Sequence, residues 1–370
     1  MPPTDELIDW GLAATTADRL VRPGPQVSRA EAEAVVADLR RYADAAVGHV
    51  FEVTGLQAST SVAPIMVVDR RGWVRANMAG LREVLIPLAE KVEERRSSGR
   101  ASDLALTLGS RVTGFEVGTV LAYLSSRVLG QYELFSESSN GSSGSLLLVA
   151  PNVVHIEREL KVTPSDFRLW VCVHEETHRV QFTAVPWLRD HLRGEIREFL
   201  SATEVDPSAM AQQLRSALER LVESARNPQP GESTASLLDV VQTPRQREIL
   251  DRLTAVMSLL EGHADYVMDA VGPQVIPSVA EIRQRFQRRR TNVGRFDQTV
   301  RRFLGIDAKL RQYRDGERFV RTVVEQVGMD GFNKVWTSPN TLPTASEISD
   351  PNAWVRRVHG DGQDTAAITE

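Results

Sequence analysis

Two histidines four residues apart, with a glutamate beside the first, form the strongest chemical signal in the chain. They are His174, Glu175 and His178, in the sequence VHEETHRVQF. On a helix, residues i and i+4 project from the same side, so both imidazoles could reach one zinc ion at about 2.1 Å. Glu175 lies about 100° further around the helix. Its carboxylate would stand beside the open position of the metal, where it could take a proton from bound water.

The surrounding residues predict the helix that this site requires. Thr163 is a good N-cap, Pro164 favours the first helical position, and Pro186 stops the helix, which we expect over about 164–185. The two histidines therefore lie well inside it. Apolar residues share their face, so the pair is expected to point inward, where imidazoles without a partner would be costly.

A zinc site needs a third protein ligand, and the segment LEGHAD offers three candidates. It falls within a helix expected over 244–271. Glu261 and Asp265 are i and i+4 on one flank of the apolar stripe of this helix, whereas His263 lies about 160° from Glu261. One helix cannot direct both Glu261 and His263 at a single metal ion.

We choose Glu261 as the third ligand, because an acid that borders a core stripe requires a cation. Asp265 could then hold a metal-bound histidine through its second ring nitrogen. The alternative for both acids is a solvated flank of the helix. We expect His263 to be a structural histidine, with a role as ligand or as donor to a developing oxyanion left open.

Helical signals dominate the remaining sequence and predict a mainly α (α+β) protein with a small β-sheet. The sheet is expected around 63–68 and 131–155, with a hairpin whose strands flank the loop SESSNGSSG. The segment 111–130 reads as a buried helix that allows close packing, because it is apolar and rich in small residues. Further helices are expected from Ser28 to about Val50 and over 74–97, 187–201, 207–226, 278–290, 294–304, 307–313 and 315–328.

No gap between the helices resembles a domain seam. We therefore expect a single domain over residues 1–355, followed by a polar and disordered tail over 356–370. A basic cluster at 283–290 is more simply explained by a solvated helix face or intramolecular ion pairs than by an acidic partner.

Composition narrows the classes of function. The 370 residues are 42% hydrophobic with a net charge of −5. That charge gives no general attraction to nucleic acid or to an anionic membrane, so neither is an expected partner. A single cysteine and an N-terminus without a secretory signal predict a cytoplasmic location. No apolar run approaches the roughly 20 residues that span a bilayer. The oligomeric state is left undetermined.

These motifs bring out a family resemblance over most of the chain. The sequence resembles actinobacterial zincin-like proteins identified as hydrolases or metalloproteases, one branch of which is associated with biosynthesis of the deazaflavin coenzyme. The resemblance implies a gluzincin-like metallopeptidase core, with His174 and His178 as ligands, Glu175 as general base and Glu261 as third ligand, followed by Asp265 in a Glu-x-x-x-Asp pattern. The segments that carry it are DWGLAATTADRLVRPGP, FEVTGL, VHEETHRVQF, LLEGHADYVMDAVG and GFNKVWTSPNTLPT.

Three functions compete at this point. In the first, a metallopeptidase or related hydrolase, zinc polarises a carbonyl and Glu175 moves the proton. Residues 131–150 could then supply an edge strand that pairs with an extended peptide. In the second, the same fold has a non-catalytic binding or regulatory role with structural or absent metal, against which the intact Glu175 argues. The third is hydrolysis of a small amide or cofactor precursor, which a narrow pocket would favour.

Overall fold

The computed structural model of the chain describes Thr4 and residues 7–57, 64–97, 103–137, 143–202, 243–291 and 306–360. The expected helices at 207–226 and 294–304 and most of the loop SESSNGSSG lie outside the described residues. Within them, no helix is both long and apolar enough to cross a membrane.

A three-stranded sheet forms the centre of the fold. Its strands are β1 (Ile65–Val68), β2 (Gly130–Glu137) and β3 (Ser143–Val149), in the order β1-β3-β2. β1 runs parallel to β3, and β2 runs antiparallel to it. The central strand is completely buried from Leu146 to Val149, as expected for a strand covered on both faces. The predicted strand and hairpin are therefore confirmed.

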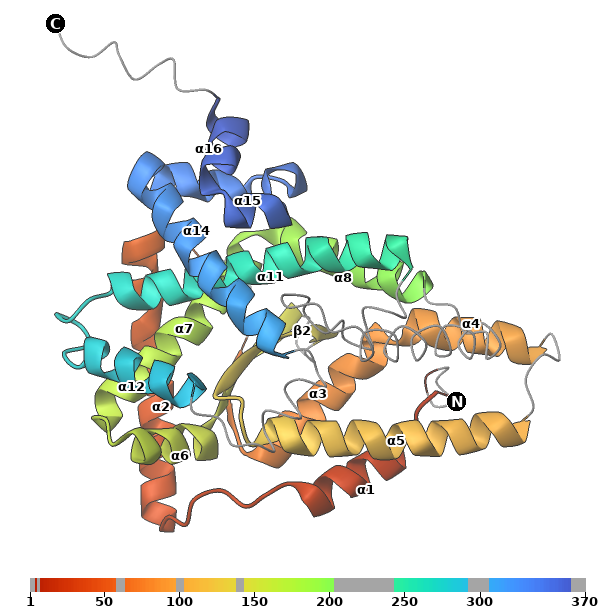
Figure 1. The fold of residues 1–370 in the computed structure, drawn as a ribbon. Helices are drawn as coiled ribbons and strands as arrows, with labels where there is room; N and C mark the ends of the chain where they lie inside the picture. The colour runs from red at the N-terminus through yellow and green to blue at the C-terminus, as the bar shows by residue number, and fades with distance from the viewer. Residues whose placement is uncertain are drawn as a thin grey trace, which may run out of the picture.

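Helices make up most of the structure, which confirms the mainly α (α+β) prediction (Figure 1). They are α1 (Trp10–Leu20), α2 (Arg29–Thr54), α3 (Arg70–Val84), α4 (Ile86–Ser97), α5 (Asp103–Ser125), α6 (Ala150–Leu160), α7 (Pro164–Ala184), α8 (Pro186–Ser201), α11 (Pro244–Ala270), α12 (Val279–Thr291), α14 (Ile306–Phe332), α15 (Ala345–Ser349) and α16 (Pro351–His359), with short 3₁₀ turns at Asn333–Trp336 and Pro339–Thr341.

Several predicted boundaries are wrong. The sheet ends at Val149, because Pro151 stands in the first turn of α6 and cannot continue a ladder of backbone hydrogen bonds. The helix expected over 74–97 is divided at Leu85 into α3 and α4. α14 joins two expected helices in one element whose backbone departs from helical geometry only at Gly328, with φ of 71°. α16 reaches His359, so residues 356–359 are helical rather than part of a tail.

α5 packs against α1 through its small residues. A Cβ atom on Gly114 would lie 2.5 Å from the carbonyl oxygen of Asp9, and one on Gly118 would collide with the carbonyl oxygen of Ala13. The close packing predicted for this helix is present. Its full burial is wrong, since Val112 and Phe115 on the outer side are 59% and 55% exposed.

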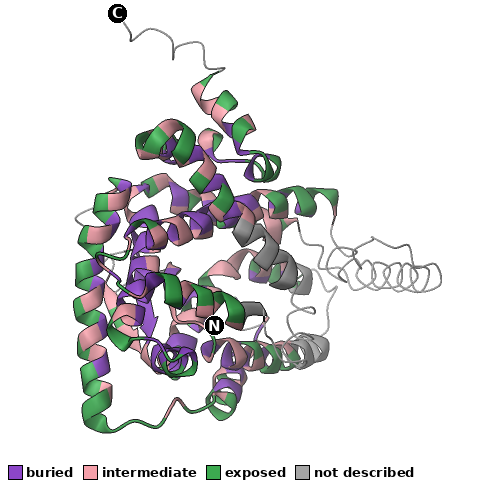
Figure 2. Cartoon of the chain, turned by 60° about the vertical axis from the view of Figure 1, so that its left-hand side comes forward, coloured by how far each residue is buried: buried purple, intermediate pink, exposed green. Residues whose placement is uncertain are grey.

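The sheet places α7 on one face and α3 on the other. Tyr132 of β2 stacks on Phe182 of α7, with ring centroids 5.4 Å apart. On the opposite face, Gln131 accepts a hydrogen bond from the indole N–H of Trp73 in α3. α7 contributes to the two larger clusters of buried apolar residues. Figure 2 shows buried residues concentrated where helices and sheet meet, with exposed residues on the outward faces.

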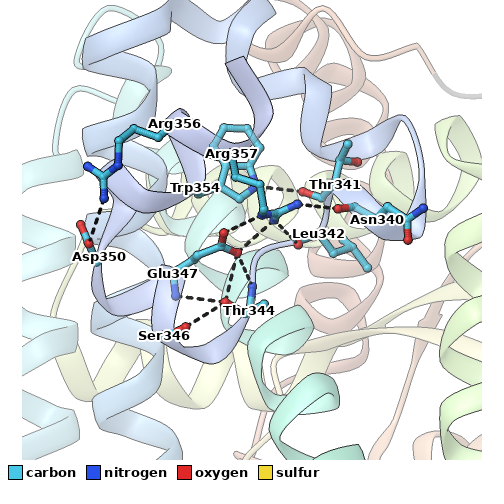
Figure 3. A network of polar contacts seen from close by, with 10 residues as sticks. All are labelled: Asn340, Thr341, Leu342, Thr344, Ser346, Glu347, Asp350, Trp354, Arg356 and Arg357. Carbon is cyan, nitrogen blue, oxygen red and sulfur yellow. Dashed lines mark hydrogen bonds and ion pairs between the residues drawn. The ribbon is translucent and has the colours of Figure 1, made fainter. Parts of the chain in front are cut away.

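The C-terminal elements are fixed by one polar network (Figure 3). The guanidinium of Arg357 donates to both carboxylate oxygens of Glu347, at 2.6 and 3.0 Å, and to the carbonyl oxygens of Asn340 and Leu342. Glu347 also accepts from the backbone N–H of Thr344, completing a capping box at the start of α15. These contacts join α15 and α16 to the turns that follow α14.

Candidate metal centre

The structure brings the three predicted metal ligands together. His174 and His178 lie one turn apart on α7, and Glu261 approaches from α11. The two Nε2 atoms are 3.3 Å apart, and Oε2 of Glu261 lies 3.7 Å and 3.8 Å from them. A tetrahedral zinc ion with bonds of roughly 2.0–2.1 Å separates its ligand atoms by roughly 3.4 Å. The donor set and its spacing therefore fit zinc with one open position.

α14 crosses α11 (Figure 1). Two glycines, Gly262 next to Glu261 and Gly316 of α14, allow the two helices to approach closely at this crossing. A Cβ atom on Gly262 would lie 2.5 Å from the backbone nitrogen of Glu317, and one on Gly316 would collide with the backbone of Ser258. Backbone packs on backbone at this crossing. The close contact between α11 and α14 therefore fixes the backbone position of Glu261.

A second layer of hydrogen bonds orients His178. Its Nδ1 atom lies 3.0 Å from Oε1 of Gln181, whose amide nitrogen donates to the carbonyl oxygen of Leu260 and lies 3.0 Å from Nδ1 of His263. With its oxygen toward His178, the Gln181 amide accepts the Nδ1–H of that ring. The Nε2 lone pair is then left for a metal, which is the usual arrangement behind a histidine ligand.

His263 lies in the core and not in the cavity. Its ring is fully buried against Phe332 and Trp336, with centroids 5.2 and 5.5 Å away. Burial, followed by the charge of His178, lowers the pKa of His263 to about 3, so the ring is neutral and its Nδ1 can accept from Gln181. This buried position agrees with the expectation that His263 is a structural histidine. His263 is not among the residues that line the cavity, and a role as metal ligand or oxyanion donor stays a prediction.

His174 has a different neighbour behind it. Its Nδ1 atom lies 3.1 Å from the thioether sulfur of Met268, a buried residue of α11. Sulfur is a weak acceptor, so this contact holds the ring mainly by packing. Asp265 lines the same cavity one turn beyond Glu261. Its predicted hydrogen bond to a histidine ligand stays a prediction.

Glu175 is almost completely buried and lines the cavity beside the ligands. Burial, with a further contribution from the negative charge of Glu261, raises its pKa well above the ordinary value for a glutamate. Gly130, the first residue of β2, lies against it: a Cβ atom there would stand 2.5 Å from Cδ of Glu175. The absence of a side chain at Gly130 therefore leaves the room that the carboxylate occupies.

A cavity of about 980 Å³ opens beside the candidate ligands, and His174 and Glu261 are among the residues that line it. Trp170 and Phe286 form an apolar part of its wall, packed edge to face with ring centroids 5.1 Å apart. Arg283 of α12 contributes a charged part, where it forms ion pairs with Asp269 and with Glu317. Within the basic cluster at 283–290, Arg283 therefore forms intramolecular ion pairs, as the sequence suggested.

Sequence reasoning missed the two residues behind the histidines. Gln181 stands three residues after His178, so the same helical spacing that pairs the ligands could have identified it. Met268 belongs to the apolar stripe of α11 and gives no signal in the sequence that separates it from an ordinary core residue.

The site consists of a helix with two histidines and a glutamate, which packs against a small mixed sheet, and of an acid from a later helix. This arrangement defines a zincin-type metal-site protein. Known proteins agree with this class. The chain belongs to the family described as zincin-like metallopeptidase, whose model matches residues 8–355. The match supports a hydrolase and implies a metal, typically zinc.

A solved structure from Chloroflexus aurantiacus, described as a putative hydrolase with a novel fold, is similar to this chain. The identity is 31% and the TM-score 0.67, and the alignment covers 96% of this chain and all of the other. No curated protein matches. The fold shared with this structure extends over nearly the whole chain.

Proposed function

We propose that this protein is a zinc-dependent hydrolase that cleaves a peptide or amide bond. One observation carries the proposal: the ligand atoms of His174, His178 and Glu261 lie within 4.8 Å of one another, and the carboxylate of Glu175 lines the same cavity. A purely structural metal site would not need that additional buried acid. The family match and the hydrolase-like relative support the same class.

Glu175 and Gln181 have different roles in the proposed reaction. Bound zinc would supply Lewis-acid polarisation of the substrate carbonyl and a more acidic water. Glu175 takes the proton from the attacking water and delivers it to the leaving nitrogen. Gln181 holds His178 in the tautomer that presents Nε2.

The size of the cavity bears on the competing functions. A volume of about 980 Å³ is at the upper end of the roughly 300–1,000 Å³ typical of ligand pockets. A cavity of this volume favours a peptide over a small amide or cofactor precursor. A non-catalytic binding protein of the same fold is the remaining alternative. A cytoplasmic location, the absence of nucleic-acid or membrane partners and an association with deazaflavin biosynthesis belong to the proposal as well.

Elemental analysis of purified protein after zinc reconstitution tests the metal, using His174→Ala and Glu261→Ala as ligand variants. We expect about one zinc per chain, lost in both variants. Glu175→Gln provides the matched test of chemistry, since it should keep the zinc and abolish hydrolysis in a peptide-library screen. Protein that takes up no zinc would shift the assignment to the binding role, and full hydrolysis by Glu175→Gln would refute the general base.

A further inference from the structure

One wall of the metal cavity is the turn that joins α5 to β2, residues 126–130, which we call the wall turn. Residues 127–130 line the cavity. The last of them, Gly130, lies against the proposed base: a Cβ atom on Gly130 would stand 2.5 Å from Cδ of Glu175. A shift of the wall turn would therefore move the surface on which the Glu175 carboxylate rests.

The side chain of Asn152 in α6 holds the wall turn without lining the cavity itself. Its Nδ2 atom donates to the carbonyl oxygen of Ser125 at 2.7 Å and to that of Val128 at 2.6 Å. Ser125 is the last residue of α5, and the final carbonyl groups of a helix have no partner within it. Asn152 is only 1% exposed, so bulk water does not compete for these two bonds.

Arg70, the first residue of α3, determines which way the Asn152 amide faces. Its Nε atom donates to Oδ1 of Asn152 at 2.7 Å, and its Nη1 atom donates to the carbonyl oxygens of Arg22 and Pro23. A guanidinium can only donate and a carbonyl can only accept. The amide oxygen must therefore face Arg70, and the amide nitrogen must face the carbonyls at the wall turn.

α3 also holds the residue that follows the wall turn. Trp73 donates through its indole N–H to Oε1 of Gln131 at 2.9 Å, and Gln131 donates to Oδ1 of Asn77 at 2.9 Å. Arg70, Trp73 and Asn77 are i, i+3 and i+7 on one face of α3. The wall turn is thus held at both ends by side chains of α3 and α6, and no residue of either helix lines the cavity.

We propose, on the basis of the hydrolase function above, that Asn152 is a positioning residue for the base Glu175. It acts through the wall turn: its two hydrogen bonds fix the backbone that ends at Gly130, and Gly130 limits where the Glu175 carboxylate can lie. Arg70 contributes by fixing the orientation of the Asn152 amide. Asn152 touches neither metal nor substrate in this role, so its loss should change the placement of the base and leave the zinc ligands in place.

Asn152→Asp tests this with almost no change of shape. The new carboxylate still accepts from Arg70, but it cannot donate to the carbonyl oxygens at the wall turn and repels them. Glu157→Gln is the matched control on the same helix. Glu157 is buried and accepts two hydrogen bonds from Arg168, and it forms none to the wall turn in the part of the chain that the structure describes.

Acetohydroxamate is the probe, because it binds zinc through its two oxygens and can share a proton with a carboxylate beside the metal. Calorimetry with zinc-loaded protein would measure its affinity without any need for turnover. We expect Asn152→Asp to weaken binding about tenfold, since a displaced group loses much of its effect, and Glu157→Gln to leave the affinity within a factor of about two. Zinc content should be unchanged in both variants.

A double variant separates positioning of the base from a general loss of structure. If Asn152 acts through Glu175, adding Asn152→Asp to Glu175→Gln should change the hydroxamate affinity less than about twofold. If Asn152→Asp fails to fold by circular dichroism, Asn152→Ala takes its place, because alanine removes both donors without adding a charge.

Three results would overturn the inference: unchanged affinity in Asn152→Asp, an equal loss in Glu157→Gln, or a further tenfold loss in the double variant. Zinc-loaded wild-type protein that does not bind the hydroxamate would overturn it as well. Zinc content and hydrolysis by the wild-type protein judge the proposed function separately, so a failure of the one can be told from a failure of the other.

Discussion

Replacing Gln181 with leucine is expected to weaken zinc binding without touching a ligand. Leucine is similar in size but cannot accept the Nδ1–H of His178 or donate to His263 and the carbonyl oxygen of Leu260. Loss of such a hydrogen bond behind a metal ligand typically costs about 10–100-fold in affinity. That range corresponds to about 1.4–2.8 kcal/mol of binding free energy.

The same substitution should lower the stability of the metal-free protein. The rings of His178 and His263 would each keep a nitrogen without its present partner, at about 1–3 kcal/mol for each buried group. Gln181→Glu separates the two effects. Its carboxylate still accepts from His178 but cannot donate to His263, so zinc affinity should be maintained while the metal-free protein is less stable.

Competition with a chromophoric chelator would measure the zinc affinity, and thermal unfolding with and without zinc would measure stability. Gln326→Leu is the matched control, because Gln326 is exposed on α14 and bonds only to Asn352 among the described residues. Zinc affinity of Gln181→Leu within a factor of two of wild type would refute the role assigned to this amide.

Three further predictions concern the base, the C-terminal network and the metal. Gly130→Ala should lower kcat about 100-fold with unchanged zinc affinity, because the added methyl group would displace the Glu175 carboxylate from its position. Gly194→Ala is the control, since a Cβ atom there meets open space, and equal activities of the two variants would contradict the prediction. Desolvation raises the pKa of Glu347, but hydrogen bonds from Arg357 and Thr344 outweigh it and hold that pKa below its ordinary value. The resulting stability is present above the unfolded pKa of about 4.3 and is lost as pH falls below it, so Glu347→Gln should be less stable at pH 7 in urea unfolding, with a difference that shrinks below pH 4. Zinc at about 1,000 times its Kd should stabilise wild type by about 4 kcal/mol in the same assay, and His178→Ala should show no such gain.

Local sequence was sufficient where the physical cause is local. The caps and the terminal proline located α7 within one residue, and the 3.6-residue period placed His174 and His178 on one side of it. The start expected for the helix over 244–271 is likewise the observed start of α11, where Pro244 follows the N-cap Thr243. Boundaries failed where packing decided them, as at Leu85, where an expected single helix is divided.

Contacts between distant elements could be anticipated only in part. The different flanks of Glu261 and His263 showed that only one of them could face the metal, and Glu261 was favoured because an acid that borders a core stripe requires a cation. The sequence could not show which flank of α11 faces α7, since helical period defines faces but not their neighbours. That choice depends on the crossing with α14, where Gly262 and Gly316 bring the backbones together.

Helical period, capping and turn residues predicted a mainly helical fold, a small sheet with a hairpin, and a helix that carries two histidines and a glutamate at a spacing suited to zinc. Only the packing of distant elements brings Glu261 of α11 close to the two histidines of α7, links His263 to His178 through Gln181, and places Gly130 of β2 against Glu175. The reason is physical. Helical period and capping act over a few residues, whereas a site built from several elements depends on how their surfaces pack, which no local pattern records.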